Sequence, residues 1–196
     1  MPNKPDIIYA NPCKARTHIV EAVRRGVYRM TFDNTAEVAK CASVSKKIEL
    51  IVRMITDDSG SQCRLSSKFG APRAKWRSLL AAAKEYGLQV VGCSFHVGSG
   101  CHDASRYDLA LKDAKELIEL GKKEFGFNMH IVDIGGGFPG ETHSLWNPAD
   151  LDVENEAEED EEEDEADPEE PVKEDRPYMF FNEIAEHVAP VIGKYF

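Results

Sequence analysis

A glycine-rich segment in the second half of the chain is the first candidate for chemistry. Residues 133–140 read Asp-Ile-Gly-Gly-Gly-Phe-Pro-Gly and follow an apolar run that predicts a β-strand. The consecutive glycines Gly135, Gly136 and Gly137 let the backbone approach a ligand closely and direct several N–H groups at it, which suits a phosphate. The segment matches neither the Walker loop nor the G-x-G-x-x-G dinucleotide motif. A sharp turn that needs positive φ explains the glycines about equally well.

A second candidate segment, Ser94–Cys101, also follows a predicted strand and reads Ser-Phe-His-Val-Gly-Ser-Gly-Cys. The alternation places His96 on one face at the end of the strand, and Ser99 between two glycines can offer a hydroxyl to an anion. A lone histidine near an apolar strand is more often a packed core residue, by roughly two to one. The following Gly-Ser-Gly favours a binding site here.

A third candidate is Arg53, which lies inside the apolar run 51–55. A buried arginine must be paired, because an isolated charge is costly to remove from water. A phosphate or carboxylate ligand would satisfy it. Asp57 or Asp58 would satisfy it equally well, so the residues alone leave both interpretations open.

These segments belong to a chain in which short apolar runs alternate with helical patterns. Strands are predicted over residues 7–10, 27–32, 48–54, 88–97 and 129–134, and helices over 15–25, from Asp33 or Asn34, over 72–86, 103–124 and 177–195. Leu109, Leu117 and Leu120 are candidate core residues of the fourth helix. Five β-then-α units predict a parallel sheet with helical crossovers and both faces covered. This pattern alone slightly favours an open, doubly wound sheet over a (β/α)8 barrel, because five strands cannot close such a barrel.

The net charge of -11 is concentrated in one segment. Residues 150–175 hold 17 of the 35 acidic residues and one of the 24 basic ones, so the rest is mildly basic. Like charges repel and cannot be buried, so 150–176 is predicted to be a disordered acidic insertion between a segment 1–149 and a helix 177–196 of the same domain.

No apolar run is long enough to span a membrane, no secretory signal is recognisable, and the five cysteines lack the spacing of a metal site or disulfide framework. We therefore expect reduced thiols and a cytoplasmic location, and no metal, nucleic acid or membrane as ligand.

The order of several motifs resembles the ornithine decarboxylase family of fold type III pyridoxal-phosphate enzymes. The resemblance covers about residues 6–145 and the last helix. It rests on Asn11-Pro12-Cys13-Lys14, Thr31-Phe32-Asp33, Arg53 with Thr56-Asp57-Asp58, Cys63-Arg64-Leu65-Ser66 with Lys68-Phe69-Gly70, Ser94–Cys101 and Asp133–Gly140. It implies part of a (β/α)8 barrel, about its third to seventh strands, in place of the open sheet.

The resemblance also implies roles for the candidate residues. His96 would stack on the pyridine ring of pyridoxal 5'-phosphate, Ser99 and the glycines Gly135 to Gly137 would hold its phosphate, and Arg53 would lie beside it. The implied reaction is decarboxylation of ornithine to putrescine in polyamine biosynthesis, in which the cofactor ring stores the electrons of the broken bond. Relatives that act on lysine, arginine or diaminopimelate are alternatives, although the Asn-Pro-Cys-Lys and Cys-Arg-Leu-Ser strings favour the ornithine type.

Other motifs of the family do not occur in these 196 residues. The Tyr-Ala-Val-Lys type strand with the Schiff-base lysine, the Glu-Pro-Gly-Arg segment and the β-domain with the catalytic cysteine are absent, and Lys14 belongs to a different motif. No catalytic residue is therefore assigned, and the isolated chain is expected to be inactive. The full-length family forms homodimers.

An alternative function is an antizyme-inhibitor-like binding module that uses Lys14 to Glu37. In that segment, Lys14, Arg16, Arg24, Arg25 and Arg29 predict a basic patch. A third interpretation is a non-functional gene fragment.

Overall fold

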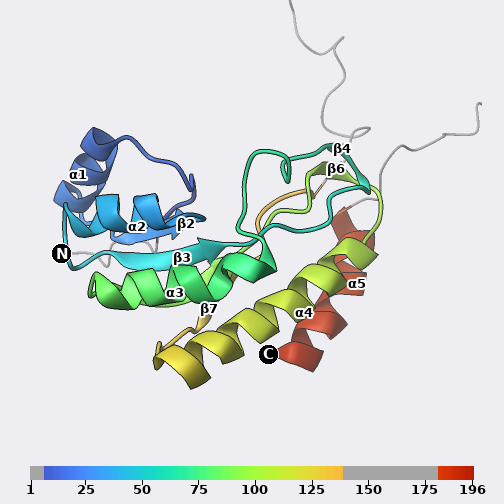
Figure 1. Cartoon of the computed structure of the whole chain (residues 1–196). Coiled ribbons are helices and arrows are strands. Elements are labelled where there is room, and N and C mark those ends of the chain that lie inside the picture. Colours follow the sequence, from blue (N-terminus) through green and yellow to red (C-terminus); the bar gives the residue numbers. More distant parts are fainter. Residues whose placement is uncertain (1–6, 139–180) are drawn as a thin grey trace, which may run out of the picture.

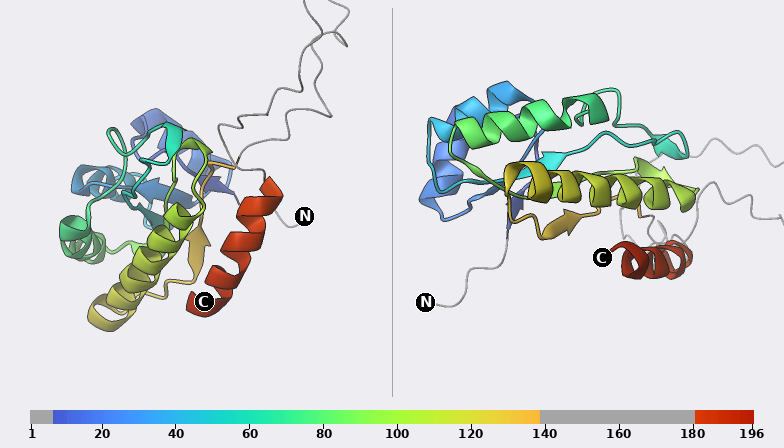
Figure 2. Two further views of the ribbon diagram at one scale, coloured as in Figure 1. Left: turned by 90° about the vertical axis from the view of Figure 1, so that its right-hand side faces the viewer. Right: turned by 60° about the horizontal axis from the view of Figure 1, so that its bottom comes forward.

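Five parallel strands form the centre of the molecule. The computed structural model describes residues 7–138 and 181–196. The sheet has the order β1 (Ile8–Tyr9), β2 (Arg29–Phe32), β3 (Glu49–Arg53), β5 (Gln89–Ser94) and β7 (Ile131–Asp133), and every neighbouring pair is parallel. All five lie within the predicted strands. The sheet is curled like half a barrel, which confirms the partial barrel and corrects the open sheet that the pattern alone had slightly favoured (Figures 1 and 2).

Helices connect the strands along the outside of the curled sheet (Figure 2). Their bounds are α1 (Arg16–Arg24), α2 (Thr35–Ala42), η1 (Arg73–Lys75), α3 (Trp76–Glu85), α4 (Ser105–Leu120), the π-helical segment η2 (Gly121–Phe125) and α5 (Phe181–Tyr195). The side chain of Asn34 caps α2 by accepting a hydrogen bond from the Glu37 N–H at 2.9 Å, as predicted. The acidic segment 150–176 and the predicted start of the last helix lie outside the described residues.

The core lies between the sheet and these helices. Leu50, Ile51 and Val52 of β3 are all fully buried, as expected for a strand covered on both faces. Leu117 of α4 is buried and Leu120 packs partly against the core, but Leu109 is 52% exposed. The prediction for Leu109 was therefore wrong, because that position of α4 lies away from the sheet.

A small two-stranded sheet was not predicted. β4 (Ser61–Cys63) pairs antiparallel with β6 (Ser99–Cys101), within segments whose sequence had indicated loops. The Ser61 hydroxyl donates to the Val97 carbonyl at 2.6 Å and joins the small sheet to the segment that follows β5. Figure 1 shows the pair beyond the ends of the central strands.

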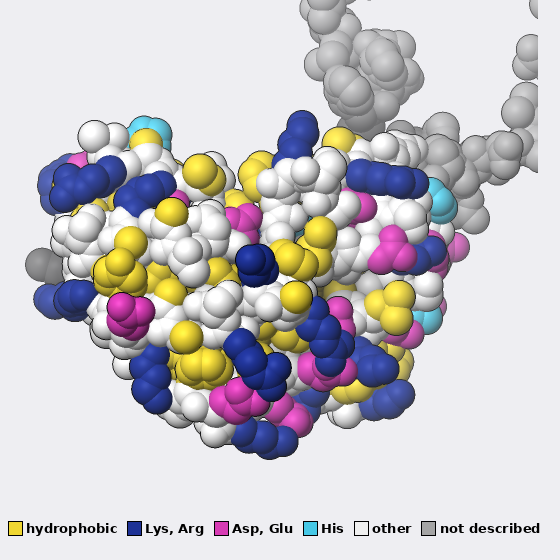
Figure 3. Space-filling model, in the orientation of Figure 1, with side chains coloured by type: hydrophobic (Ala, Val, Ile, Leu, Met, Phe, Trp, Pro, Cys, Tyr) yellow, Lys and Arg dark blue, Asp and Glu magenta, His cyan; other side chains and the backbone are white. Residues whose placement is uncertain are grey.

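The outer face of α3 and α4 carries interspersed charges of both signs (Figure 3). Arg77 of α3 forms a two-bond ion pair with Glu124, with distances of 2.6 and 3.0 Å, and Arg73 lies 3.4 Å from Asp113. No helix of the described part of the chain combines the length and the apolar character needed to cross a membrane. The same residues contain no cluster of three or more histidine, cysteine or acidic side chains placed to hold a metal ion.

Candidate functional site

Two polar loops leave the sheet at the same end. β5 and β7 are parallel neighbours with Ser94 opposite Asp133, so the loops that follow them begin side by side. The Phe95 N–H donates to the Asp133 carbonyl at 3.1 Å. Farther along, the Cys101 N–H donates to the Gly137 carbonyl, also at 3.1 Å. The carboxyl ends of parallel strands are where ligands bind in this class of fold, so the loops define the candidate site.

His96 is half-buried in this site, and a hydrogen bond to one of its ring nitrogens determines which nitrogen carries the proton. The backbone N–H of Gly98 donates to Nδ1 at 3.0 Å, which leaves the proton of the neutral ring on Nε2. Burial lowers the pKa of His96, and the nearby charge of Arg53 lowers it further. His96 therefore presents a neutral, flat ring at the carboxyl end of the sheet, close enough that a Cβ added to Gly136 would lie 2.6 Å from Nε2.

The glycines of the second loop have no room for a side chain. Gly135 has a φ of 68° and Gly137 a φ of 104°, conformations that other residues rarely adopt. A Cβ on Gly135 would lie 2.0 Å from the Phe95 carbonyl oxygen, and one on Gly137 would lie 2.6 Å from the Gly98 carbonyl oxygen. Both glycines thus allow the loop to pack directly on the backbone that follows β5.

Ser99 begins β6 and is exposed. It directly follows Gly98, whose carbonyl lies against Gly137, and it pairs with Cys63 of β4. The predicted phosphate-binding residues Ser99 and Gly135 to Gly137 are therefore brought together by the fold. The unpredicted β4–β6 sheet fixes the backbone conformation at Ser99.

Arg53 lies at the carboxyl end of β3, in register with Ser94 of β5 and Asp133 of β7. It is half-buried, and its guanidinium lies 5.9 Å from the centre of the Phe69 ring. Burial lowers the pKa of Arg53, while the charges of Asp133 and Asp33 oppose that effect.

The aspartates considered as alternative partners of Arg53 have other roles. Asp57 pairs with Arg106. Asp58 accepts hydrogen bonds from the backbone N–H groups of Leu65 and Ser66 at 2.6 and 2.7 Å. Pairing of Arg53 with Asp57 or Asp58 was thus a wrong interpretation.

Ser94 is a member of the site that sequence reasoning missed. It is 2% exposed, and its hydroxyl has no hydrogen-bond partner among residues 7–138 and 181–196. A buried polar atom without a partner is rare in proteins, and a ligand or a water molecule can supply the missing partner. Together with the glycine backbone and the neutral ring of His96, it makes this end of the sheet fit a ring that carries a phosphate.

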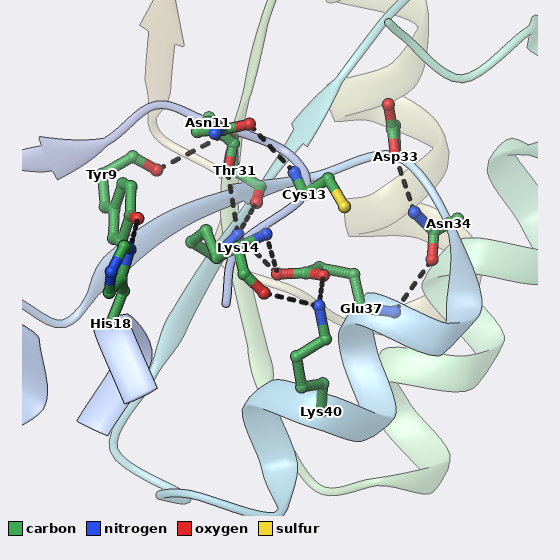
Figure 4. A network of polar contacts seen from close by, with 10 residues as sticks. All are labelled: Tyr9, Asn11, Cys13, Lys14, His18, Thr31, Asp33, Asn34, Glu37 and Lys40. Carbon is green, nitrogen blue, oxygen red and sulfur yellow. Dashed lines mark hydrogen bonds and ion pairs between the residues drawn. The ribbon is translucent and has the colours of Figure 1, made fainter. Parts of the chain in front are cut away.

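Lys14 lies in a buried network of ion pairs and hydrogen bonds (Figure 4). Its ammonium lies 2.8 Å from a carboxylate oxygen of Glu37 and donates to the carbonyl oxygens of Asn11 and Thr31 at 3.0 and 2.6 Å. The other carboxylate oxygen of Glu37 pairs with Lys40 at 2.6 Å. The side chains of Lys14 and Glu37 are essentially unexposed, so Lys14 holds the loop after β1 on α2.

This burial corrects the predicted basic patch. Lys14 does not contribute to the surface, and Arg29 pairs with Glu49 at 3.1 Å. Arg24 and Arg25 are exposed but share Glu21, and their hydrogen bonds to it lower the pKa of Glu21 to about 2. The patch is therefore smaller and less positive than the sequence indicated.

Comparison with known proteins relates this geometry to a family. A family model described as the pyridoxal-binding domain of pyridoxal-dependent decarboxylases matches residues 2–196. Ornithine decarboxylase of Caenorhabditis elegans is 51% identical over 138 residues, which are 70% of this chain and 32% of the relative. Antizyme inhibitor 2 of Xenopus laevis is 49% identical over 138 residues, which are 70% of this chain and 30% of the relative. The chain spans about a third of the length of these relatives.

Two solved structures with the same fold are decarboxylases of basic amino acids. The arginine decarboxylase of Paramecium bursaria Chlorella virus has a TM-score of 0.71 at 28% identity over 97% of this chain and 42% of its own. Lysine decarboxylase of Selenomonas ruminantium has a TM-score of 0.61 at 37% identity, over 67% of this chain and 34% of its own. The chain therefore belongs to the pyridoxal-dependent decarboxylase family, whose cofactor is pyridoxal phosphate.

Proposed function

We propose that this chain supplies the cofactor-phosphate side of the active site of an ornithine decarboxylase. Ser99 and the backbone of Gly135 to Gly137 bind the phosphate of pyridoxal phosphate, His96 stacks on its ring, and Arg53 lies beside it. The observation that carries the proposal is the direct packing of Gly135 and Gly137 on the backbone after β5, beside a neutral His96. The cofactor, when bound, supplies the electron sink for loss of the substrate carboxylate.

The chemistry of these residues suits their proposed roles. Backbone N–H groups and a hydroxyl donate to phosphate oxygens without adding a charge that would have to be desolvated. A neutral imidazole can lie flat against an aromatic ring without repulsion from the half-buried Arg53. The Ser94 hydroxyl is a further donor or acceptor for the same ligand.

Ornithine is the proposed substrate because several relatives are ornithine decarboxylases, including that of Rattus norvegicus, which is 47% identical over 152 residues, 73% of this chain and 33% of the relative. Putrescine is then the product. We further propose that the enzyme acts in the cytoplasm and as a homodimer, in line with the family resemblance of the sequence.

The phosphate contacts can be tested with pyridoxamine 5'-phosphate, which has no aldehyde and so does not react with surface lysines. We expect the chain to bind it, and to bind phosphate-free pyridoxamine about a hundredfold more weakly, because charge-assisted hydrogen bonds contribute about 1.5–3 kcal/mol each. Ser99→Ala should weaken binding of the phosphate form about tenfold. Equilibrium dialysis measures both affinities.

The matched control is Ser78→Ala on the outer face of α3, where the hydroxyl donates to the Lys75 carbonyl. It should bind like the unchanged chain. Equal affinity for the two compounds, or no binding of either, would reject the proposed phosphate site.

A second candidate function is supported by the similarity to antizyme inhibitor 2. We propose that residues 14–37 contact antizyme through the exposed side of α1, over which Lys and Arg side chains gather (Figure 3). The exposed Arg24 and Arg25 are the residues to test, since Lys14 is buried.

Reversing both charges, Arg24→Glu with Arg25→Glu, should lower the amount of chain retained by immobilised antizyme about tenfold, because rim charges set the association rate. The control is Arg73→Glu with Arg77→Glu, which reverses one exposed charge on η1 and one on α3 and should leave retention unchanged. Equal retention of both double variants would argue against this surface.

A further inference from the structure

Tyr107 connects the two loops of the candidate site. It lies in the first turn of α4 and is fully buried. Its ring meets Phe95, the residue before His96, edge-on at 6.4 Å, and stacks on Phe138, the residue after Gly137, at 5.1 Å. One side chain outside the assigned site thus packs against the start of one loop and the end of the other.

The hydroxyl of Tyr107 makes a contact that the packing of the ring does not require. It donates to the Gly136 carbonyl at 3.1 Å. Burial raises the pKa of Tyr107, so the hydroxyl keeps its proton and acts as a donor. The next carbonyl, that of Gly137, accepts from the Cys101 N–H at 3.1 Å. Both carbonyls that flank the Gly137 N–H are therefore held in place.

The direction of the Gly137 N–H follows from this anchoring. No peptide bond in the described part of the chain is cis, and the C=O and N–H of a trans peptide point in opposite directions. With the Gly136 carbonyl turned toward Tyr107, the Gly137 N–H points away from it. Within residues 7–138 and 181–196 this N–H has no hydrogen-bond partner, so it is available to an anion.

We propose that Tyr107 is a positioning residue that orients the Gly136–Gly137 peptide so that its N–H is presented to the cofactor phosphate. The inference rests on the proposed function, since it takes the phosphate site as its target. Tyr107 does not touch the ligand, but it determines the direction of one N–H group that donates to the phosphate. Without the hydroxyl, the Gly136 carbonyl loses its partner and the peptide can rotate.

The test is Tyr107→Phe, which removes the hydroxyl and keeps the ring between Phe95 and Phe138. We expect affinity for pyridoxamine 5'-phosphate to fall about fivefold to tenfold, because one donor is no longer held in place. Affinity for pyridoxamine should not change. In the ligand-free protein, the amide resonance of Gly137 should shift in a nitrogen–proton NMR spectrum, and its hydrogen exchange should become faster. The matched control is Tyr86→Phe, at an exposed tyrosine after α3.

The outcomes separate the two proposals. One outcome is that the unchanged chain binds pyridoxamine 5'-phosphate more tightly than pyridoxamine, and that Tyr107→Phe binds both compounds with the same affinities as the unchanged chain. Tyr107 then does not position the peptide, although the phosphate site stands. Equal losses for both compounds would indicate a general structural role and overturn the inference. If the unchanged chain binds neither compound, the phosphate site itself is wrong and the inference falls with it. Circular dichroism of Tyr107→Phe should match the unchanged chain, and unfolding of this variant would likewise count against a role confined to one peptide.

Discussion

Gly137→Ala is expected to weaken binding of pyridoxamine 5'-phosphate about a hundredfold or more, the loss that follows when two charge-assisted hydrogen bonds are broken. The new Cβ would lie 2.6 Å from the Gly98 carbonyl oxygen and 2.7 Å from a methyl carbon of Val97. Backbone on one side and a buried side chain on the other leave nothing flexible to move. The loop itself must shift, which displaces the donors that face the phosphate. Equilibrium dialysis measures the affinity, and thermal unfolding measures the accompanying loss of stability.

Two other glycines provide a matched control and a graded comparison. Gly126 shares a positive φ of 74°, but no atom lies within 4 Å of its Cβ position. Gly126→Ala therefore reports the backbone strain alone and should leave ligand binding intact. Gly136→Ala should have an intermediate effect, because its Cβ would meet the end of the His96 side chain, which can rotate away. If Gly137→Ala bound as well as Gly126→Ala, the close approach of the two loops would not be needed for binding.

The sequence predicted the order and direction of the strands well, and the reason is physical. Apolar runs that alternate with helical patterns favour parallel strands joined by helical crossovers, and Arg53, Ser94 and Asp133, which end β3, β5 and β7, lie at one edge of the sheet. The curl of the sheet could not be predicted in the same way. An open sheet and a barrel both cover the two faces of β3, so they produce the same apolar pattern, and the family resemblance decided between them.

The features that sequence reasoning missed depend on long-range contacts. β4 and β6 have three residues each, too few for a periodic signal, and their pairing joins Ser61 to Cys101 across the intervening β5 unit. Ser94 begins a candidate segment, but the sequence could not show that its hydroxyl is buried with no partner among the described residues. Lys14 looked like a surface charge because its partners Thr31 and Glu37 lie 17 and 23 residues away.

Loss of Glu37 is expected to destabilise the fold strongly. Glu37→Ala should lower the free energy of unfolding by about 3–5 kcal/mol, because it leaves the Lys14 ammonium buried without its counter-charge. Both side chains are at most 1% exposed, so water cannot replace the lost partner. Urea unfolding followed by circular dichroism measures the change. Glu21→Ala is the control: Glu21 also pairs with two basic side chains but is exposed, and its loss should have little effect.

The double variant Lys14→Met with Glu37→Leu separates the ion pair from the packing around it. Replacing both charges by apolar groups of similar size should recover most of the stability lost in Glu37→Leu alone, so the double-mutant cycle with the single variants Lys14→Met and Glu37→Leu should give a coupling of about 2 kcal/mol or more. A coupling near zero would mean that solvent reaches the pair and that α2 is held to the loop after β1 by packing alone. A large coupling instead requires Lys14 to stay bound to Glu37. A lysine held in this way cannot also be the amine that bonds to the cofactor, so the same measurement tests whether Lys14 is a structural residue.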